Sequence, residues 1–217
     1  MESTLLQVLP RFAPEFVQAL GVNLSVAAHA MTVGLPMGVL LGMIHLPSPA
    51  PSRRWMRQAA AGLAGAVTAL LRAAPAFVVM YVLLHATPLR WGIGPESAVA
   101  LALAFYAAAY VADTLQPAVL DWRLGGTAGA QLFLTGLVRC FFVMVLSSGF
   151  GAAVGVVEAT AVTLRALEQL PTTADRLGLM GGVVLVFIAM RQTVTLAVSA
   201  LRRLIPARAP GAQRDRR

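Results

Sequence analysis

The chain has 217 residues, of which 58% are hydrophobic and only 12% are charged, and its mean hydropathy is +0.75. Soluble domains have about 45–50% apolar and about 25% charged residues, so this chain has too little charge to cover a water-facing surface. The net charge of +8 comes from 17 basic residues, all of them Arg, against nine acidic ones. The composition therefore excludes an ordinary soluble domain and indicates an integral membrane protein.

Five stretches are long and apolar enough to cross a bilayer as helices, which takes about 20 residues for a hydrocarbon layer of about 30 Å. We predict an all-α membrane fold with about five transmembrane helices, over residues 16–44, 59–86, 97–115, 131–157 and 177–201. The first, second and fourth stretches exceed one crossing. We therefore expect tilt, a kink at Pro36 or Pro75, or extension beyond the lipid.

The chain divides into three parts. Residues 1–15 are predicted to form an external segment, residues 16–204 a single transmembrane domain, and residues 205–217 a basic cytoplasmic tail without fixed structure. The first segment has no basic start, so it does not resemble a cleaved signal peptide. Residues 158–176 have mixed polarity and contain Pro171, which predicts a short external amphipathic helix followed by a turn.

The distribution of arginine predicts the orientation of the spans, because short cytoplasmic loops retain basic residues. The loop at 45–57 and the tail after residue 201 contain nine Arg between them. We therefore predict that the N-terminus lies outside and the C-terminus in the cytoplasm. No basic stripe is interleaved with aromatic residues, so we expect lipid and not nucleic acid as the surroundings of this charge.

Three glycines repeat every four residues in the first span, namely Gly34, Gly38 and Gly42. This spacing places them on one helix face, where they allow another helix to approach closely. An alternative interpretation is that glycine is simply frequent in membrane helices. Either interpretation concerns assembly and not catalysis.

Charged residues at membrane depth are costly, and four of them are functional candidates: Arg72, Asp113, Arg139 and Arg191. For the last three an alternative is that the side chain reaches toward the cytoplasmic interface. Arg72 has apolar sequence on both sides and Pro75 follows it within one turn. This makes Arg72 the strongest candidate of the four.

The sequence does not predict a metal centre or a nucleotide site. The three histidines fall on different segments without ligand spacing, and Cys140 is the only cysteine. No phosphate-binding or acyl-transfer motif stands in a strand-to-helix context. We therefore expect no enzyme activity, no metal and no cofactor on this chain, with any ATP bound by a partner subunit.

Three segments, in order, resemble the permease subunit of ABC importers of the polar amino acid type, which has the MetI-like transmembrane fold. Residues 71–78 (LRAAPAFV) keep the Arg and Pro of an R-G-T-P box, and residues 108–113 (AAYVAD) resemble G-A-Y-L-A-E. Residues 149–159 (GFGAAVGVVEA) resemble S-L-x-x-x-I-G-V-P-E-L. The resemblance covers about residues 21–204.

The resemblance implies a subunit of a bacterial inner-membrane importer. Its partners would be a second permease subunit, an ATP-binding subunit and a periplasmic solute-binding protein. The candidates for the ATPase-coupling loop are Asp121, Trp122, Arg123, Leu124, Gly125 and Gly126. The candidates for the translocation path are Arg72, Pro75, Tyr106, Tyr110, Asp113, Ser147, Ser148 and Glu158.

Two parts of the chain depart from the family pattern. The stretch at 120–131 lacks the E-A-A of the coupling motif, and Tyr106-Ala107 stands where relatives have an Asn-Ser pair. Relatives have K-D-T-S where this chain has residues 146–149 (LSSG). An alternative function is therefore a structural or regulatory membrane subunit that keeps the permease scaffold without transporting a solute.

Overall fold

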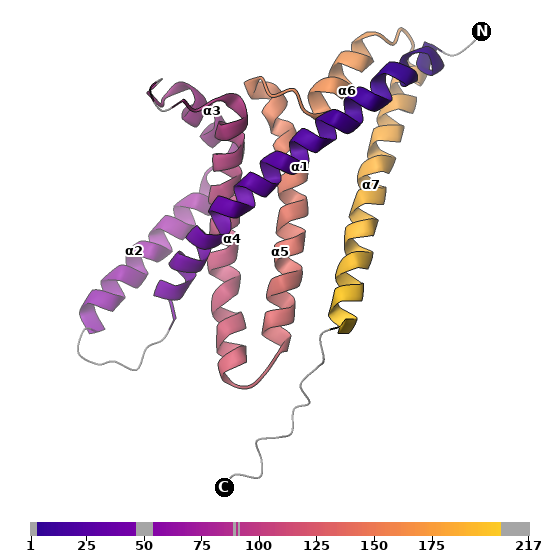
Figure 1. The fold of residues 1–217 in the computed structure, drawn as a ribbon. Coiled ribbons are helices and arrows are strands. Elements are labelled where there is room, and N and C mark those ends of the chain that lie inside the picture. Colours follow the sequence, from indigo (N-terminus) through magenta and orange to yellow (C-terminus); the bar gives the residue numbers. More distant parts are fainter. Residues whose placement is uncertain (1–3, 47–53, 89, 91, 205–217) are drawn as a thin grey trace.

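The computed structural model describes residues 4–46, 54–88, 90 and 92–204, and Figure 1 shows helices joined by turns and short connections. The elements are α1 (Thr4–Ile44), α2 (Arg54–Ala73), α3 (Ala76–His85), α4 (Pro95–Arg123), α5 (Ala128–Ser147), the 3-10 helix η3 (Ser148–Val154), α6 (Ala159–Glu168) and α7 (Thr173–Leu204). The predicted tail at 205–217 and most of the loop at 45–57 lie outside the described residues.

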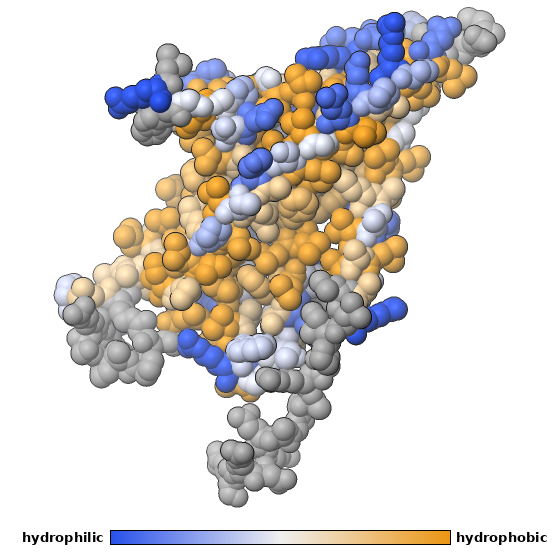
Figure 2. Space-filling model, viewed as in Figure 1, coloured by the Kyte–Doolittle hydropathy of each residue, from blue (hydrophilic) through white to orange (hydrophobic). Residues whose placement is uncertain are grey.

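Four helical segments are long and apolar enough to cross a membrane, namely α1, α4, α5 with η3, and α7; α2 and α3 together supply a fifth, broken span. Leu40, Leu63, Leu185 and Leu196 are largely exposed on these helices. In Figure 2 apolar side chains cover the middle of the molecule, with polar ones gathered toward its two ends. Lipid is the solvent that suits such a surface, so the predicted all-α membrane fold with about five spans is confirmed.

The second span is broken at Pro75, one of the two sites where a kink was expected. The axes of α2 and α3 differ by 95°. Pro75 lies before the first residue of α3 with φ −61° and ψ 125°, which is an extended conformation. Because proline has no N–H and disfavours helical geometry in the residue before it, the helix ends at Ala73 and restarts at Ala76. By contrast, α1 continues through Pro36.

The main core forms where α1 crosses α4. Small side chains such as Ala27 and Ala30 of α1 and Ala104 and Ala107 of α4 are fully buried there. Gly34 and Gly38 continue this contact, since a Cβ on Gly34 would lie 2.6 Å from the Ala104 carbonyl oxygen.

The other two glycines of the repeat make the same kind of contact. A Cβ on Gly38 would lie 2.5 Å from the Ala108 carbonyl oxygen, and one on Gly42 would lie 3.2 Å from the Ala112 carbonyl oxygen. The backbones of α1 and α4 therefore touch along three successive turns, at positions where only glycine leaves room.

A second core explains why α1 begins earlier than the predicted first span. Residues 4–15, expected as a separate segment, are helical and continuous with it, although Pro10 and Pro14 fall inside the helix. Phe12 and Phe16 are buried in a cluster with residues of α6 and α7, including Val162 and Leu179. Tertiary packing of this kind outweighs a weak local preference for helix.

Candidate functional site

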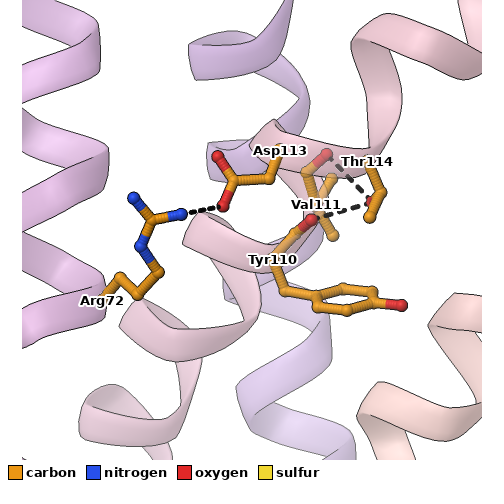
Figure 3. Close-up of polar contacts among 5 residues, drawn as sticks. All are labelled: Arg72, Tyr110, Val111, Asp113 and Thr114. Carbon is orange, nitrogen blue, oxygen red and sulfur yellow. Dashed lines mark hydrogen bonds and ion pairs between the residues drawn. The ribbon is translucent and has the colours of Figure 1, made fainter.

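Arg72 and Asp113 form an ion pair between α2 and α4. The Nη1 atom of Arg72 lies 2.7 Å from Oδ2 of Asp113, and Figure 3 shows the guanidinium pointing at the carboxylate. Arg72 lies in the last turn of α2, directly before the break at Pro75. The pair therefore fixes the end of α2 against α4 beside the bend, and it joins two of the segments that carry the sequence resemblance.

Tyr110 lies one turn before Asp113 and faces α5. Its hydroxyl contacts Gly136 of α5, where a side chain would collide with it. Tyr110, Asp113, Gly136 and Arg139 share a cavity of about 350 Å³ between α4 and α5. Tyr106 lies one turn before Tyr110 on α4, and its side chain is exposed. The candidates on α4 thus occupy successive turns of that helix, and Tyr110 and Asp113 line the cavity beside α5.

Ser148 and Glu158 belong to a separate, buried polar network built around Asn23 of α1. Nδ2 of Asn23 donates to Oγ of Ser148 at 2.7 Å and to Oε2 of Glu158 at 2.9 Å. Its Oδ1 accepts from the backbone N–H of Ala159 at 3.0 Å. The amide of one residue therefore connects α1, η3 and the start of α6.

Glu158 also caps α6. Its two carboxylate oxygens accept from the N–H groups of Thr160 and Ala161, at 2.8 and 3.0 Å. The side chain is only 1% exposed, and its negative charge lies at the positive end of the helix dipole. Glu158 and Ser148 are thus placed to hold the fold together, whereas Ser147, beside them, is half-buried outside this network.

Asn23 is a site residue that sequence reasoning missed. Charge marks a costly side chain at membrane depth, but an uncharged amide in an apolar span also needs hydrogen-bond partners. The signal was available, because Asn23 is an isolated carboxamide between apolar residues of the first span.

The predicted coupling loop is a tight turn between α4 and α5, and the part of it before residue 124 is helical. The N–H of Gly126 donates to the Asp121 carbonyl at 2.9 Å, and the N–H of Gly125 donates to the Trp122 carbonyl at 3.0 Å. Gly125 has φ +85°. These two bonds and the left-handed glycine define a Schellman motif, which satisfies carbonyls at the end of α4.

The six coupling candidates have two different surroundings. Asp121 accepts from the N–H of Gly129 through Oδ2 at 2.7 Å, so its carboxylate caps α5 while the glycines shape the turn. Trp122 and Leu124 are 57% and 81% exposed, and Arg123 is also exposed. The turn therefore presents an apolar surface with one positive charge at the end of the bundle.

Comparison with solved structures shows which fold this is. The chain matches a chain of an amino acid ABC transporter with histidines, with a TM-score of 0.72 and 18% identity over 94% of this chain and 100% of that one. It also matches two crystal forms of the MetNI methionine ABC transporter in inward-facing conformations, with TM-scores of 0.61 and 0.59. Those matches are 19% and 18% identical and each covers 92% of this chain and 99% of the other.

The fold is therefore that of ABC importer membrane subunits, over nearly the whole chain. No family model matches the sequence, and no curated protein matches it. Within the described residues, no three His, Cys, Asp or Glu side chains gather as a metal site would require.

Proposed function

We propose that the chain is a permease subunit of an ABC importer in the bacterial inner membrane, for amino acids or a related small polar solute. A second permease subunit, the same chain or a similar one, would complete the translocation path. A separate subunit would bind and hydrolyse ATP, and a periplasmic protein would deliver the solute. The observation that carries this proposal is the shared fold with two different importers over 92–94% of the chain.

The turn between α4 and α5 is the proposed contact with the ATP-binding subunit. It connects two spans through only four residues, so a displacement of its tip would move both helices together. The exposed side chains of Trp122 and Leu124 offer apolar area for such a contact. Asp121, Gly125 and Gly126 would contribute to this contact by holding the turn in its shape.

The proposal is tested by purifying the tagged chain from its native membranes in mild detergent and measuring ATPase activity in liposomes. The wild-type complex should contain an ATP-binding subunit, and the double substitution Trp122→Ala with Leu124→Ala should release it or lower the solute-stimulated ATPase rate. Leu63→Ala, at an exposed site on α2, is the matched control. A complex whose subunit content and ATPase rate are unchanged by the turn substitutions would instead favour the structural-subunit alternative.

A further inference from the structure

A cavity lies between α5 and α7, away from the ion pair of Arg72 and Asp113. Its volume is about 630 Å³, within the range of about 300–1,000 Å³ that small-molecule sites occupy. Arg139 of α5 and Arg191 of α7 both line it, together with apolar side chains such as Phe142 and Val198. The cavity thus combines an apolar wall with two positive charges.

The two helices present matching stripes to this cavity. On α5 the lining residues Thr135, Arg139 and Phe142 recur at helical spacing, and on α7 Arg191 and Thr195 do the same. The sequence pattern therefore places one arginine on each wall. Figure 1 shows α5 and α7 running beside each other.

Among the residues that the structure describes, no acidic side chain lines the cavity. Asp113 lies with Arg139 in the neighbouring cavity between α4 and α5, but its carboxylate is paired with Arg72. Within the part of the chain that the structure describes, neither Arg139 nor Arg191 has an acceptor within hydrogen-bonding distance. Two guanidiniums at membrane depth without a counter-charge are costly unless water or an anion reaches them.

The hydroxyl groups of the cavity cannot replace the guanidiniums as donors. All three donate to carbonyls of their own helix: Thr135 to Gln131 at 2.7 Å, Thr195 to Arg191 at 2.9 Å and Ser199 to Leu196 at 2.8 Å. Arg139 and Arg191 are therefore the groups that can donate hydrogen bonds to a ligand here. A guanidinium presents paired N–H groups that fit a carboxylate or a phosphate.

The depth of the arginines favours a solute over a membrane lipid. Arg139 is eleven residues from Ala128, which at about 1.5 Å per residue is about 17 Å from the start of α5. Arg191 is thirteen residues from Leu204, or about 20 Å from the end of α7. A lipid phosphate lies at the edge of the hydrocarbon layer, about 15 Å from its centre. With the start of α5 and the end of α7 placed at the membrane surface, both arginines would lie near the middle of the hydrocarbon layer, far from such a phosphate.

We propose that the cavity between α5 and α7 is a water-accessible site for a small organic anion, whose carboxylate or phosphate group binds Arg139 and Arg191 and whose apolar part lies on the helix walls. That this anion is a transported solute rests on the proposed permease function. The anion site itself rests on the cavity and its two charges.

The experiment uses the full chain with any co-purifying partners in phosphatidylcholine nanodiscs. Cys140→Ala removes the only thiol, and Thr195→Cys introduces one in the cavity. The probes are 2-sulfonatoethyl methanethiosulfonate, a small organic anion, and its trimethylammonium counterpart of similar size. Leu196→Cys, the next residue on α7 and outside the cavity lining, is the matched control.

The thiol at position 195 should react with both probes, and faster with the anion, while the one at position 196 reacts far more slowly with either. Arg139→Gln with Arg191→Gln should lower the anion-to-cation rate ratio by about tenfold or more. Arg139→Lys with Arg191→Lys keeps both charges and should keep most of the ratio. If the glutamine pair fails to fold, the single Arg191→Gln variant should still lower it.

Three results would overturn the anion site. The first is no reaction at position 195, and the second is a rate ratio that the arginine substitutions leave unchanged. The third is labelling that is blocked when phosphatidylglycerol replaces phosphatidylcholine, because the occupant would then be an anionic lipid. The labelling depends on this chain alone. Loss of the ATP-binding partner would therefore contradict the permease function and leave the anion site standing.

Discussion

Glu158 is a buried carboxylate in an apolar bundle, and its contacts explain how the fold tolerates it. Its oxygens accept from Asn23 and from two backbone N–H groups at the start of α6. Each of these donors would cost free energy if buried without an acceptor. The network therefore joins α1, η3 and α6 at a point where apolar packing alone would leave helix ends unsatisfied.

Asn23→Ala should destabilise the protein, because it removes a donor from Glu158 and the acceptor of the Ala159 N–H. The expected loss is about 1–3 kcal/mol, the cost of leaving buried polar groups unsatisfied. Thermal unfolding in detergent measures it. Ser25→Ala, two residues along α1, is the control, since the Ser25 side chain is exposed. Equal unfolding temperatures for the two variants would show that the network contributes no stability.

Residue types alone could not assign the roles of the site candidates. The Arg72 and Asp113 candidates came from the cost of charge at membrane depth, but their pairing depends on how α2 ends against α4. Ser148 and Glu158 were interpreted as path residues from sequence resemblance. The structure places both in the Asn23 network, because α1 crosses the bundle at that level.

At the scale of helices, the contact between α1 and α4 depends on close backbone approach. Gly38→Ala should destabilise the protein by about 1–3 kcal/mol, the usual cost of overpacking, because the added Cβ would meet the Ala108 carbonyl. Gly21→Ala is the control in the same helix, with no atom within 4 Å of the added Cβ. It should be neutral or slightly stabilising, since alanine favours helix. Unfolding by heat distinguishes the two, and an undisturbed Gly38→Ala variant would contradict the packing.

Hydropathy located the spans but not all of their ends. Residue 44 was predicted correctly as the end of the first span, because apolar sequence stops there. The start of α1 at Thr4 and the end of α4 at Arg123 were not, since both extensions contain polar residues and proline. The extension of α1 is stabilised by α6 and α7, which are more than 140 residues away in the sequence.

At the scale of the whole molecule, the start of α1 and the end of α7 lie at opposite ends of the bundle (Figure 1). The arginine distribution predicts that the end with Arg54, Arg123 and Arg203 is cytoplasmic. A reporter that is active only in the cytoplasm should therefore work when fused after residue 217 and fail when fused before residue 1. The reverse result would show that the protein is inserted the other way round.

The fold and the exposed turn between α4 and α5 support the proposal that this chain works as the membrane part of a larger ATP-driven assembly. Native mass spectrometry of the complex purified from its own membranes measures this directly. We expect a mass that accounts for two transmembrane subunits, at least one of them this chain of 22.8 kDa, together with ATP-binding subunits. A chain that is released alone, or only with copies of itself, would contradict the claim.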